Sequence, residues 1–295
     1  MMMEGSGLSC SYNPLASVYD LIQKEYQPER WADYIAAINQ RFGRGHTDGD
    51  GQDGKPLMAD LGCGTGRFCM SMAERGYDTI GIDLSPAMLE KAQQTWLTEK
   101  KPVCPSDCAD PLFIRQDITR FELFGTVDLM VSLLDTLNHI TYKPDLKRLF
   151  RLSANYLNPG GLFIFDLATE HHLHRVLGNQ VFYDDQQSYT LLWQNTYLKH
   201  RKVSISDLVL FTADQEMETY RDQKGTPVPA DSDTPPRYTR HELQIIERYY
   251  SRQDIETIIE PLPLTLIACY NPFSTKKAEK NAQRHFYVLQ RLTSE

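Results

Sequence analysis

The chain lacks any stretch approaching the roughly 20 consecutive apolar residues that a helix needs to cross a bilayer, so we expect no membrane partner. Residues 1–11 lack the basic start and apolar run of a secretory signal, and we expect a cytoplasmic protein. The chain has only six cysteines in 295 residues, and we expect them to be free thiols. Cys104 and Cys108 have no second pair to complete four zinc ligands, so we predict no metal site.

Positive charge is in deficit, because 31 Lys and Arg residues stand against 39 Asp and Glu residues, a net charge of -8. Proteins that hold long nucleic acids by counterion release are usually basic, so we do not expect nucleic acid as a partner. Hydrophobic residues make up 41% and charged residues 24%, the composition of a globular protein. At this length the chain can build a large core with a cleft, and small molecules are the expected partners.

Short apolar runs alternate with segments of helical period in the middle of the chain. The runs lie at Leu57–Leu61 and at residues 79–82, 112–114, 127–134 and 162–167. The helical segments lie at residues 68–75, 86–96 and 145–156, and Ser85 followed by Pro86 marks a helix start. Such alternation is typical of a parallel, doubly wound sheet.

The flanking segments follow other patterns. A helical segment is expected over residues 19–42, a glycine-rich loop over residues 43–55, and alternating strands at residues 189–197, 203–212 and 241–249. A polar, proline-rich stretch at residues 222–237 suggests a hairpin, and a helix at residues 254–259 precedes strands at Leu264–Tyr270 and residues 285–292.

The sequence therefore predicts an α/β fold, a doubly wound, Rossmann-like, seven-stranded and mostly parallel sheet with an antiparallel β insertion and an N-terminal helical segment. Residues 1–56 form an N-terminal helical cap and flexible loop, and residues 57–170 form the cofactor-binding core. Residues 171–250 form the antiparallel insertion, a lid over the substrate, and residues 251–295 supply a helix and the last two strands of the core.

A glycine loop, DLGCGTG at residues 60–66, lies between the first apolar strand and a helix, where glycines let backbone approach a ligand. A P-loop would continue with Lys and Ser or Thr, and a dinucleotide-binding loop would have its third glycine where Arg67 stands. Asp60, placed before the glycines, would repel a pyrophosphate and suits a cationic ligand. S-adenosylmethionine, with its sulfonium and ammonium groups, is such a ligand.

Two further acids end the next two strands. Asp83 lies about twenty residues past the first glycine, where a carboxylate can accept hydrogen bonds from both ribose hydroxyls. Asp117 ends the third strand and is placed to meet an adenine amino group. Three acids at three successive strand ends predict one ligand site at the carboxyl edge of the sheet.

These motifs resemble, in order, those of the class I S-adenosylmethionine-dependent methyltransferases: DLGCGTG, GIDLSPAML, RQDI, DLMVSLLDTLNHI and LNPGGLFIFDL, over residues 57–167. Within the class, the chain looks most like the branch of glycine N-methyltransferase and the amino-sugar N-methyltransferases. That resemblance implies an N-terminal segment, with Tyr26 and Trp31, folded over the cofactor, and Arg41 binding the methionyl carboxylate. It also assigns the remaining cofactor contacts, to Asp60, Gly62, Cys63, Gly64, Gly66, Asp83, Leu84, Met88, Asp117, Ile118 and Leu133.

The same resemblance places His139 beside an acceptor amine. An amine must attack as the neutral base, and His139, helped by Asp135, could take its proton near neutral pH. Tyr19 could hydrogen bond the cofactor or the acceptor. His139 as a core or capping residue and Tyr19 as a packing aromatic remain open alternatives.

Four other residues are predicted to meet the acceptor: Asn138, Trp193, Asn195 and Arg240. Asn138 as a turn residue and Trp193 as a core residue stay open. Related late strands often carry a Glu and a His where this chain has Leu243 and Ile245. That departure suggests a less polar acceptor or a wall that does not touch it.

We therefore predict a methyltransferase (EC 2.1.1.-) that uses S-adenosylmethionine and acts on a small molecule at nitrogen, with no metal. Methylation at oxygen or carbon, a cofactor-binding protein without turnover, and a tRNA or protein methyltransferase are the alternatives. The expected partner is a small-molecule methyl acceptor, and a homodimer stays open.

Overall fold

The computed structural model describes residues 12–43, 54–105, 108–213, 220–221, 227–228 and 237–293. Its larger sheet has seven strands in the order β12-β13-β5-β4-β1-β2-β3. All neighbouring strands run parallel except β13, which is antiparallel to both β5 and β12. The strands are β1 (Leu57–Leu61), β2 (Asp78–Asp83), β3 (Leu112–Arg115), β4 (Val127–Ser132), β5 (Leu157–Ala168), β12 (Leu264–Tyr270) and β13 (Arg284–Arg291). The predicted Rossmann-like fold is confirmed.

Helices cover both faces of this sheet. The helices α2 (Pro28–Phe42) and α3 (Arg67–Ala73) pack on one face against Leu129 and Val131 of β4. The helices α5 (Lys143–Tyr156) and α6 (Arg252–Ile259) pack on the other face, against Met130 and the aromatic side chains of β5. Because β4 is buried on both sides, it reads as an almost unbroken apolar run.

The predicted N-terminal helical segment is interrupted. A turn of 3-10 helix, Asn13–Leu15, precedes α1 (Tyr19–Ile22), and α2 begins only at Pro28. Pro28 lacks an N–H and restricts the residue before it, so the chain cannot pass through residue 28 as one continuous helix. Asp20 of α1 accepts a hydrogen bond from Thr65 Oγ1 at 2.7 Å, which ties this segment to the glycine loop. Most of the predicted loop at residues 43–55 lies outside the described residues.

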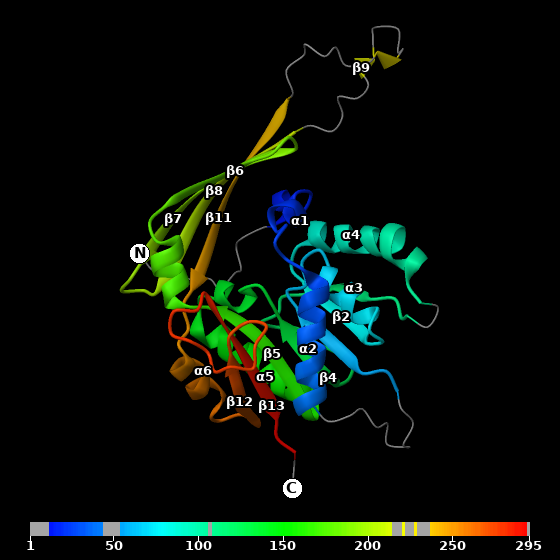
Figure 1. The fold of residues 1–295 in the computed structure, drawn as a ribbon, viewed down its shortest axis with the longest axis vertical. Coiled ribbons are helices and arrows are strands. Elements are labelled where there is room, and N and C mark those ends of the chain that lie inside the picture. The colour runs from blue at the N-terminus through cyan, green and yellow to red at the C-terminus, as the bar shows by residue number, and fades with distance from the viewer. Residues whose placement is uncertain are drawn as a thin grey trace.

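A second sheet of four antiparallel strands, in the order β11-β8-β7-β6, extends from one end of the molecule, with α1 between it and α4 (Figure 1). Its strands are β6 (Val181–Asp185), β7 (Tyr189–Leu198), β8 (Val203–Ala213) and β11 (Tyr238–Arg248). The antiparallel insertion is thus present, with β6 as a strand that the pattern did not reveal. The predicted hairpin at residues 222–237 lies largely outside the described residues, apart from β10 (Pro227–Val228), which pairs with β9 (Tyr220–Arg221).

One expectation about cysteine is wrong. Cys104 and Cys108 form a disulfide instead of remaining free thiols. The loop after α4 (Pro86–Thr95) and its extension Trp96–Lys100 turns back on itself, with Cys108 N–H donating to the Pro105 carbonyl at 2.9 Å. This turn brings the two Cα atoms to 6.2 Å, within the usual span of a disulfide. In the described part of the chain, no three His, Cys, Asp or Glu side chains group as metal ligands, and no helix is long and apolar enough to cross a membrane.

Candidate functional site

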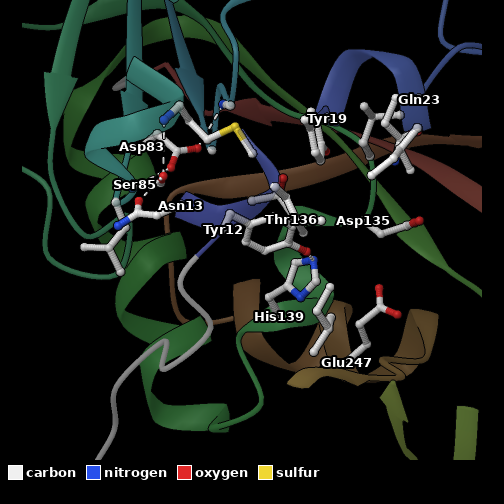
Figure 2. A pocket seen from close by; sticks show the side chains of 18 of the residues that line it. Tyr12, Asn13, Tyr19, Gln23, Asp83, Ser85, Asp135, Thr136, His139 and Glu247 are labelled. Atoms are coloured by element: carbon white, nitrogen blue, oxygen red, sulfur yellow. Dashed lines mark hydrogen bonds between the residues drawn. The ribbon is translucent and has the colours of Figure 1, made fainter. Parts of the chain in front are cut away.

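A cavity of about 510 Å³ lies between the carboxyl edge of the large sheet and the second sheet. Its walls come from the N-terminal segment, the glycine loop, the ends of β2 and β3, the turn after β4, and strands β7, β8 and β11. Figure 2 shows Asp83 and Ser85 at one end of this cavity and Glu247 and Asp135 at the other. The volume falls within the range of small-molecule sites, about 300–1,000 Å³.

Backbone without side chains forms part of the cavity wall at the glycine loop. Gly62 and Gly64 both have left-handed backbone conformations, with φ of +85° and +54°. A Cβ on Gly62 would collide with Thr136, and a Cβ on Gly64 would project towards the ring of Tyr19, 3.9 Å away. Only glycine at positions 62 and 64 keeps this part of the cavity wall open, and we call the backbone of Gly62 and Gly64 the glycine cradle.

Asp83 is held rigidly at the end of β2. Its carboxylate accepts hydrogen bonds from the backbone N–H groups of Gly64 at 2.9 Å and Ser85 at 2.8 Å. Ser85 Oγ in turn caps α4 at Met88 and donates to Asn13 Oδ1 at 2.6 Å. Burial raises the pKa of Asp83, and these backbone hydrogen bonds oppose that shift. The N-terminal segment and the strand end thus position one carboxylate at the cavity wall.

His139 lies towards the opposite end of the cavity, on a short 3-10 helix, Thr136–His139. Its Nε2 is 3.2 Å from the Tyr12 hydroxyl, and Figure 2 shows the two side chains facing each other. Burial lowers its pKa from 6.5, against the opposing effects of Asp135 and a hydrogen bond to the Ile246 backbone. A ring N–H that donates to the Ile246 carbonyl leaves Nε2 with a lone pair. His139 is therefore a neutral base at pH 7.

Beside His139, an ion-pair network fixes the turn that follows β4. Arg284 Nη2 is 2.8 Å from Asp135 Oδ2, and Arg284 Nη1 is 2.6 Å from Asp166 Oδ2. Asp166 also accepts the backbone N–H groups of Leu134 at 2.8 Å and Asp135 at 3.2 Å. Both of those residues have positive φ, +58° and +63°, which is costly for residues other than glycine. The network thus holds a strained turn that aims Asp135 at the cavity.

Comparisons with known proteins bear on the family and the fold of the chain. Residues 58–161 match a methyltransferase domain family. A putative methyltransferase of Bacillus subtilis is 30% identical over 185 residues, which cover 62% of this chain and 66% of that protein. A crystal structure of an S-adenosylmethionine-dependent methyltransferase from Clostridium acetobutylicum has a TM-score of 0.74 at 26% identity, covering 96% of this chain and 99% of that chain. The chain carries a class I methyltransferase domain.

The fold extends to a more distant structure, that of a sugar N-methyltransferase from Streptoalloteichus. Its TM-score is 0.63 at 18% identity, and the match covers 99% of this chain and 100% of that chain. The cofactor of the methyltransferase domain is S-adenosylmethionine. The residues present fit it, because the open backbone at Gly64 and the carboxylate of Asp83 line one continuous cavity.

About half of the predicted site residues line this cavity. They are Tyr19, Gly62, Gly64, Asp83, Leu84, Met88, Ile118, Asp135, His139 and Trp193. The others do not line it: Tyr26, Trp31, Arg41, Asp60, Cys63, Gly66, Asp117, Leu133, Asn138, Asn195 and Arg240.

On the N-terminal side, other contacts explain why three of the predicted residues do not line the cavity. Arg41 is exposed near the end of α2, with its guanidinium over the Phe42 ring, and so does not line the cavity. Trp31 packs in the core against Phe273 and Phe286, and Tyr26 packs beside it.

Behind the glycine loop, Asp60 is almost completely buried and accepts a hydrogen bond from Cys69 Sγ. Burial raises the pKa of Asp60 to about 7. Asp60 therefore lies behind the glycine loop and does not line the cavity.

Three predicted residues are occupied by structural contacts. Asp117 caps a turn by accepting from the N–H and hydroxyl of Thr119, both at 2.8 Å. Asn138 is fully buried and bridges backbone groups, donating to the Arg248 carbonyl and accepting from the Ala168 N–H. Arg240 is exposed on β11, where it pairs with Glu242. None of the three reaches the cavity.

Sequence reasoning missed other cavity residues. They include Tyr12, Asn13, Gln23, Ser85, Arg115, Gln116, Ser206, Leu208, Ile245 and Glu247. Glu247 was within reach of the pattern, because it lies two positions beyond Ile245 and alternation in a strand puts both on one face. No sequence pattern near Arg284 or Asp166 indicates that these two side chains form an ion pair.

Proposed function

We propose that this protein transfers a methyl group from S-adenosylmethionine to a nitrogen atom of a small molecule. The observation that carries the proposal is His139, a half-buried neutral imidazole whose Nε2 faces the cavity that also contains the glycine cradle and Asp83. A base in this position has a role if the acceptor arrives protonated, which is the usual state of an alkyl amine at pH 7.

Each residue has a defined task in the proposed reaction. The cofactor, when bound, supplies a methyl group on a sulfonium, and its displacement forms the new N–C bond while the C–S electrons stay on sulfur. Asp83 orients the ribose, and His139 Nε2 takes the proton from the acceptor nitrogen. The second sheet covers the reacting atoms and limits the entry of water.

Only the residues of the site support nitrogen as the atom that accepts the methyl group. The sugar N-methyltransferase from Streptoalloteichus shares only the fold with this chain, at 18% identity. Attack by a neutral hydroxyl would also need a base, but a hydroxyl carries no charge for the carboxyl groups near His139 to attract. Those carboxyl groups belong to Asp135 and Glu247.

The most direct test uses cofactor labelled in its methyl group, incubated with the protein and a cell extract. Labelled products are then identified by mass spectrometry. A labelled secondary or tertiary amine supports the proposal, whereas a labelled ether, ester or carbon-methyl product would contradict it. Cofactor binding by calorimetry without any labelled product would favour a binding protein without turnover.

Asp83→Ala should weaken cofactor binding about 100-fold, because two hydrogen bonds to a charged group are lost at about 1.5 kcal/mol or more each. Calorimetry with S-adenosylhomocysteine measures this directly. Asp78→Ala, at the opposite end of β2 and away from the cavity, is the matched control and should leave the affinity unchanged. An Asp83→Ala protein that remains folded and binds as tightly as wild type would show the ribose assignment to be wrong.

A further inference from the structure

The second sheet presents a graded surface to the cavity. Its register places Trp193 opposite Leu208, and the next rows pair Asn195 with Ser206 and Ile245, then Ser204 with Glu247. Because alternate residues of a strand share a face, these rows lie on the face that Ile245 and Glu247 present to the cavity. The surface therefore changes from apolar to polar over three rows.

Polar atoms at the far end of this surface have no partners in the described part of the chain. Asn195 Nδ2 and Ser204 Oγ are unpaired, although each residue is only 1% exposed. Asp135 Oδ1 is also buried without a hydrogen bond. Of these residues and Glu247, Asp135 and Glu247 line the cavity, whereas Asn195 and Ser204 do not. Buried polar groups in proteins are nearly always satisfied, so a polar ligand group would complete the hydrogen bonding of Asp135.

Carboxyl groups outnumber basic groups at this end of the cavity. Arg284 is the one cation among three carboxyl groups, those of Asp135, Asp166 and Glu247, in this region of the described chain. Burial raises the pKa of Glu247, Asp135 raises it further, and Arg284 only partly opposes this. The histidines offer no compensation, because burial lowers the pKa of both His139 and His172. A pKa of about 8 keeps Glu247 mostly protonated at pH 7 when no ligand is bound, and a cationic ligand group beside it would favour loss of that proton and stabilise the carboxylate.

We propose that the methyl acceptor is an amine carried on an apolar or aromatic body, and that Glu247 binds its ammonium group. Leu191, Trp193 and Ile245 then enclose the body, next to the polar row (Figure 2 shows Glu247 beside His139). The proposal rests on the proposed methyl transfer to nitrogen. A sugar hydroxyl placed against Ile245 would lose its hydrogen bonds to water without replacement, which disfavours a polar body.

The test measures binding of three probes by calorimetry with S-adenosylhomocysteine present. They are 2-phenylethylamine, 2-phenylethanol, which lacks the charge, and D-glucosamine, which lacks the apolar body. We expect wild type to bind 2-phenylethylamine at least about tenfold more tightly than either of the others. Glu247→Gln should remove about tenfold or more of that affinity, the effect of one charge-assisted hydrogen bond, and leave 2-phenylethanol unchanged.

Two features keep the test interpretable. Glutamine has the shape of the protonated Glu247 side chain, so the variant should fold, and thermal unfolding verifies this. Glu242→Gln is the matched control, because Glu242 is exposed on the same strand β11 and pairs with Arg240. It should change none of the three affinities.

Several results would overturn the inference. They are equal or tighter binding of 2-phenylethanol or D-glucosamine, no binding of 2-phenylethylamine at millimolar concentration, and an equal loss for all probes in Glu247→Gln. A loss of affinity for S-adenosylmethionine but not S-adenosylhomocysteine would assign Glu247 to the sulfonium instead. A labelled methyl group on a sugar amine would refute this inference and leave nitrogen methylation standing, whereas the absence of labelled amines would refute the proposed function.

Discussion

His139→Ala is expected to lower kcat by about 10²–10⁴-fold while leaving cofactor affinity unchanged, the usual range for loss of a positioned general base. The half-buried ring is neutral at pH 7, and its Nε2 faces the cavity at the distance of a hydrogen bond from Tyr12. The measurement is single-turnover methyl transfer to the acceptor found by labelling, with calorimetry for the cofactor. His200→Ala, an exposed histidine in the turn after β7, is the control and should retain full activity.

The pH profile separates proton transfer from a purely structural role. The pKa of His139 is lowered from 6.5, so the wild-type enzyme keeps its base neutral, and the acid limb of kcat should lie below pH 6.5. In His139→Ala the acceptor must lose its proton to water, so the rate should rise with pH towards the pKa of the amine. A deficit of equal size at every pH, or no deficit, would show that His139 is not the base.

The order of elements could be predicted because each carries its own local pattern. The apolar runs of β1, β2 and β4 and the cap at Ser85 can each be recognised in a window of about ten residues. The strands and the helix start in the structure lie within a few positions of these predictions. Pro28 and Glu29 also suit a helix start, and α2 begins at Pro28.

The site was predictable only where a motif fixes the backbone. Gly62, Gly64 and Asp83 follow from a strand, a turn and a strand end, and all three line the cavity. Arg41 does not line the cavity, because a resemblance gives a position along α2 but not the face of the helix that packing turns inward. Ile35 and Ile38 are buried, and Arg41 is exposed.

Arg284 shows why the rest of the site was beyond sequence reasoning. It follows Asp135 by 149 residues and Asp166 by 118, and nothing near it in the sequence marks it as functional. It meets both carboxylates because β13 inserts antiparallel beside β5, with Arg284 opposite Ala168. Burial alone would lower the pKa of Arg284, but Asp135 and Asp166 raise it overall, so it stays charged. Only the tertiary structure brings Arg284, Asp135 and Asp166 together.

Arg284→Leu is therefore expected to destabilise the protein by about 3–5 kcal/mol at pH 8, the usual cost of leaving a buried charge without its partner. Asp166 is fully buried, and its pKa is already raised by burial, even with Arg284 opposing this. A carboxyl group whose pKa is raised by folding favours the folded state at low pH and loses that contribution as pH rises. The deficit of the variant should accordingly shrink from pH 8 to pH 5 in chemical denaturation.

The double variant Arg284→Leu/Asp166→Asn isolates the cause of this deficit. Asparagine keeps an acceptor for the backbone N–H groups of Leu134 or Asp135 but carries no charge, so it should recover much of the lost stability at pH 8. Arg291→Leu, on the same strand and partly exposed, removes a guanidinium that contacts only backbone carbonyls and should cost far less. If the single variant were as stable as wild type at both pH values, the network would not hold the turn after β4. If the double variant were no more stable than the single one, the loss would come from packing rather than from the unpaired charge.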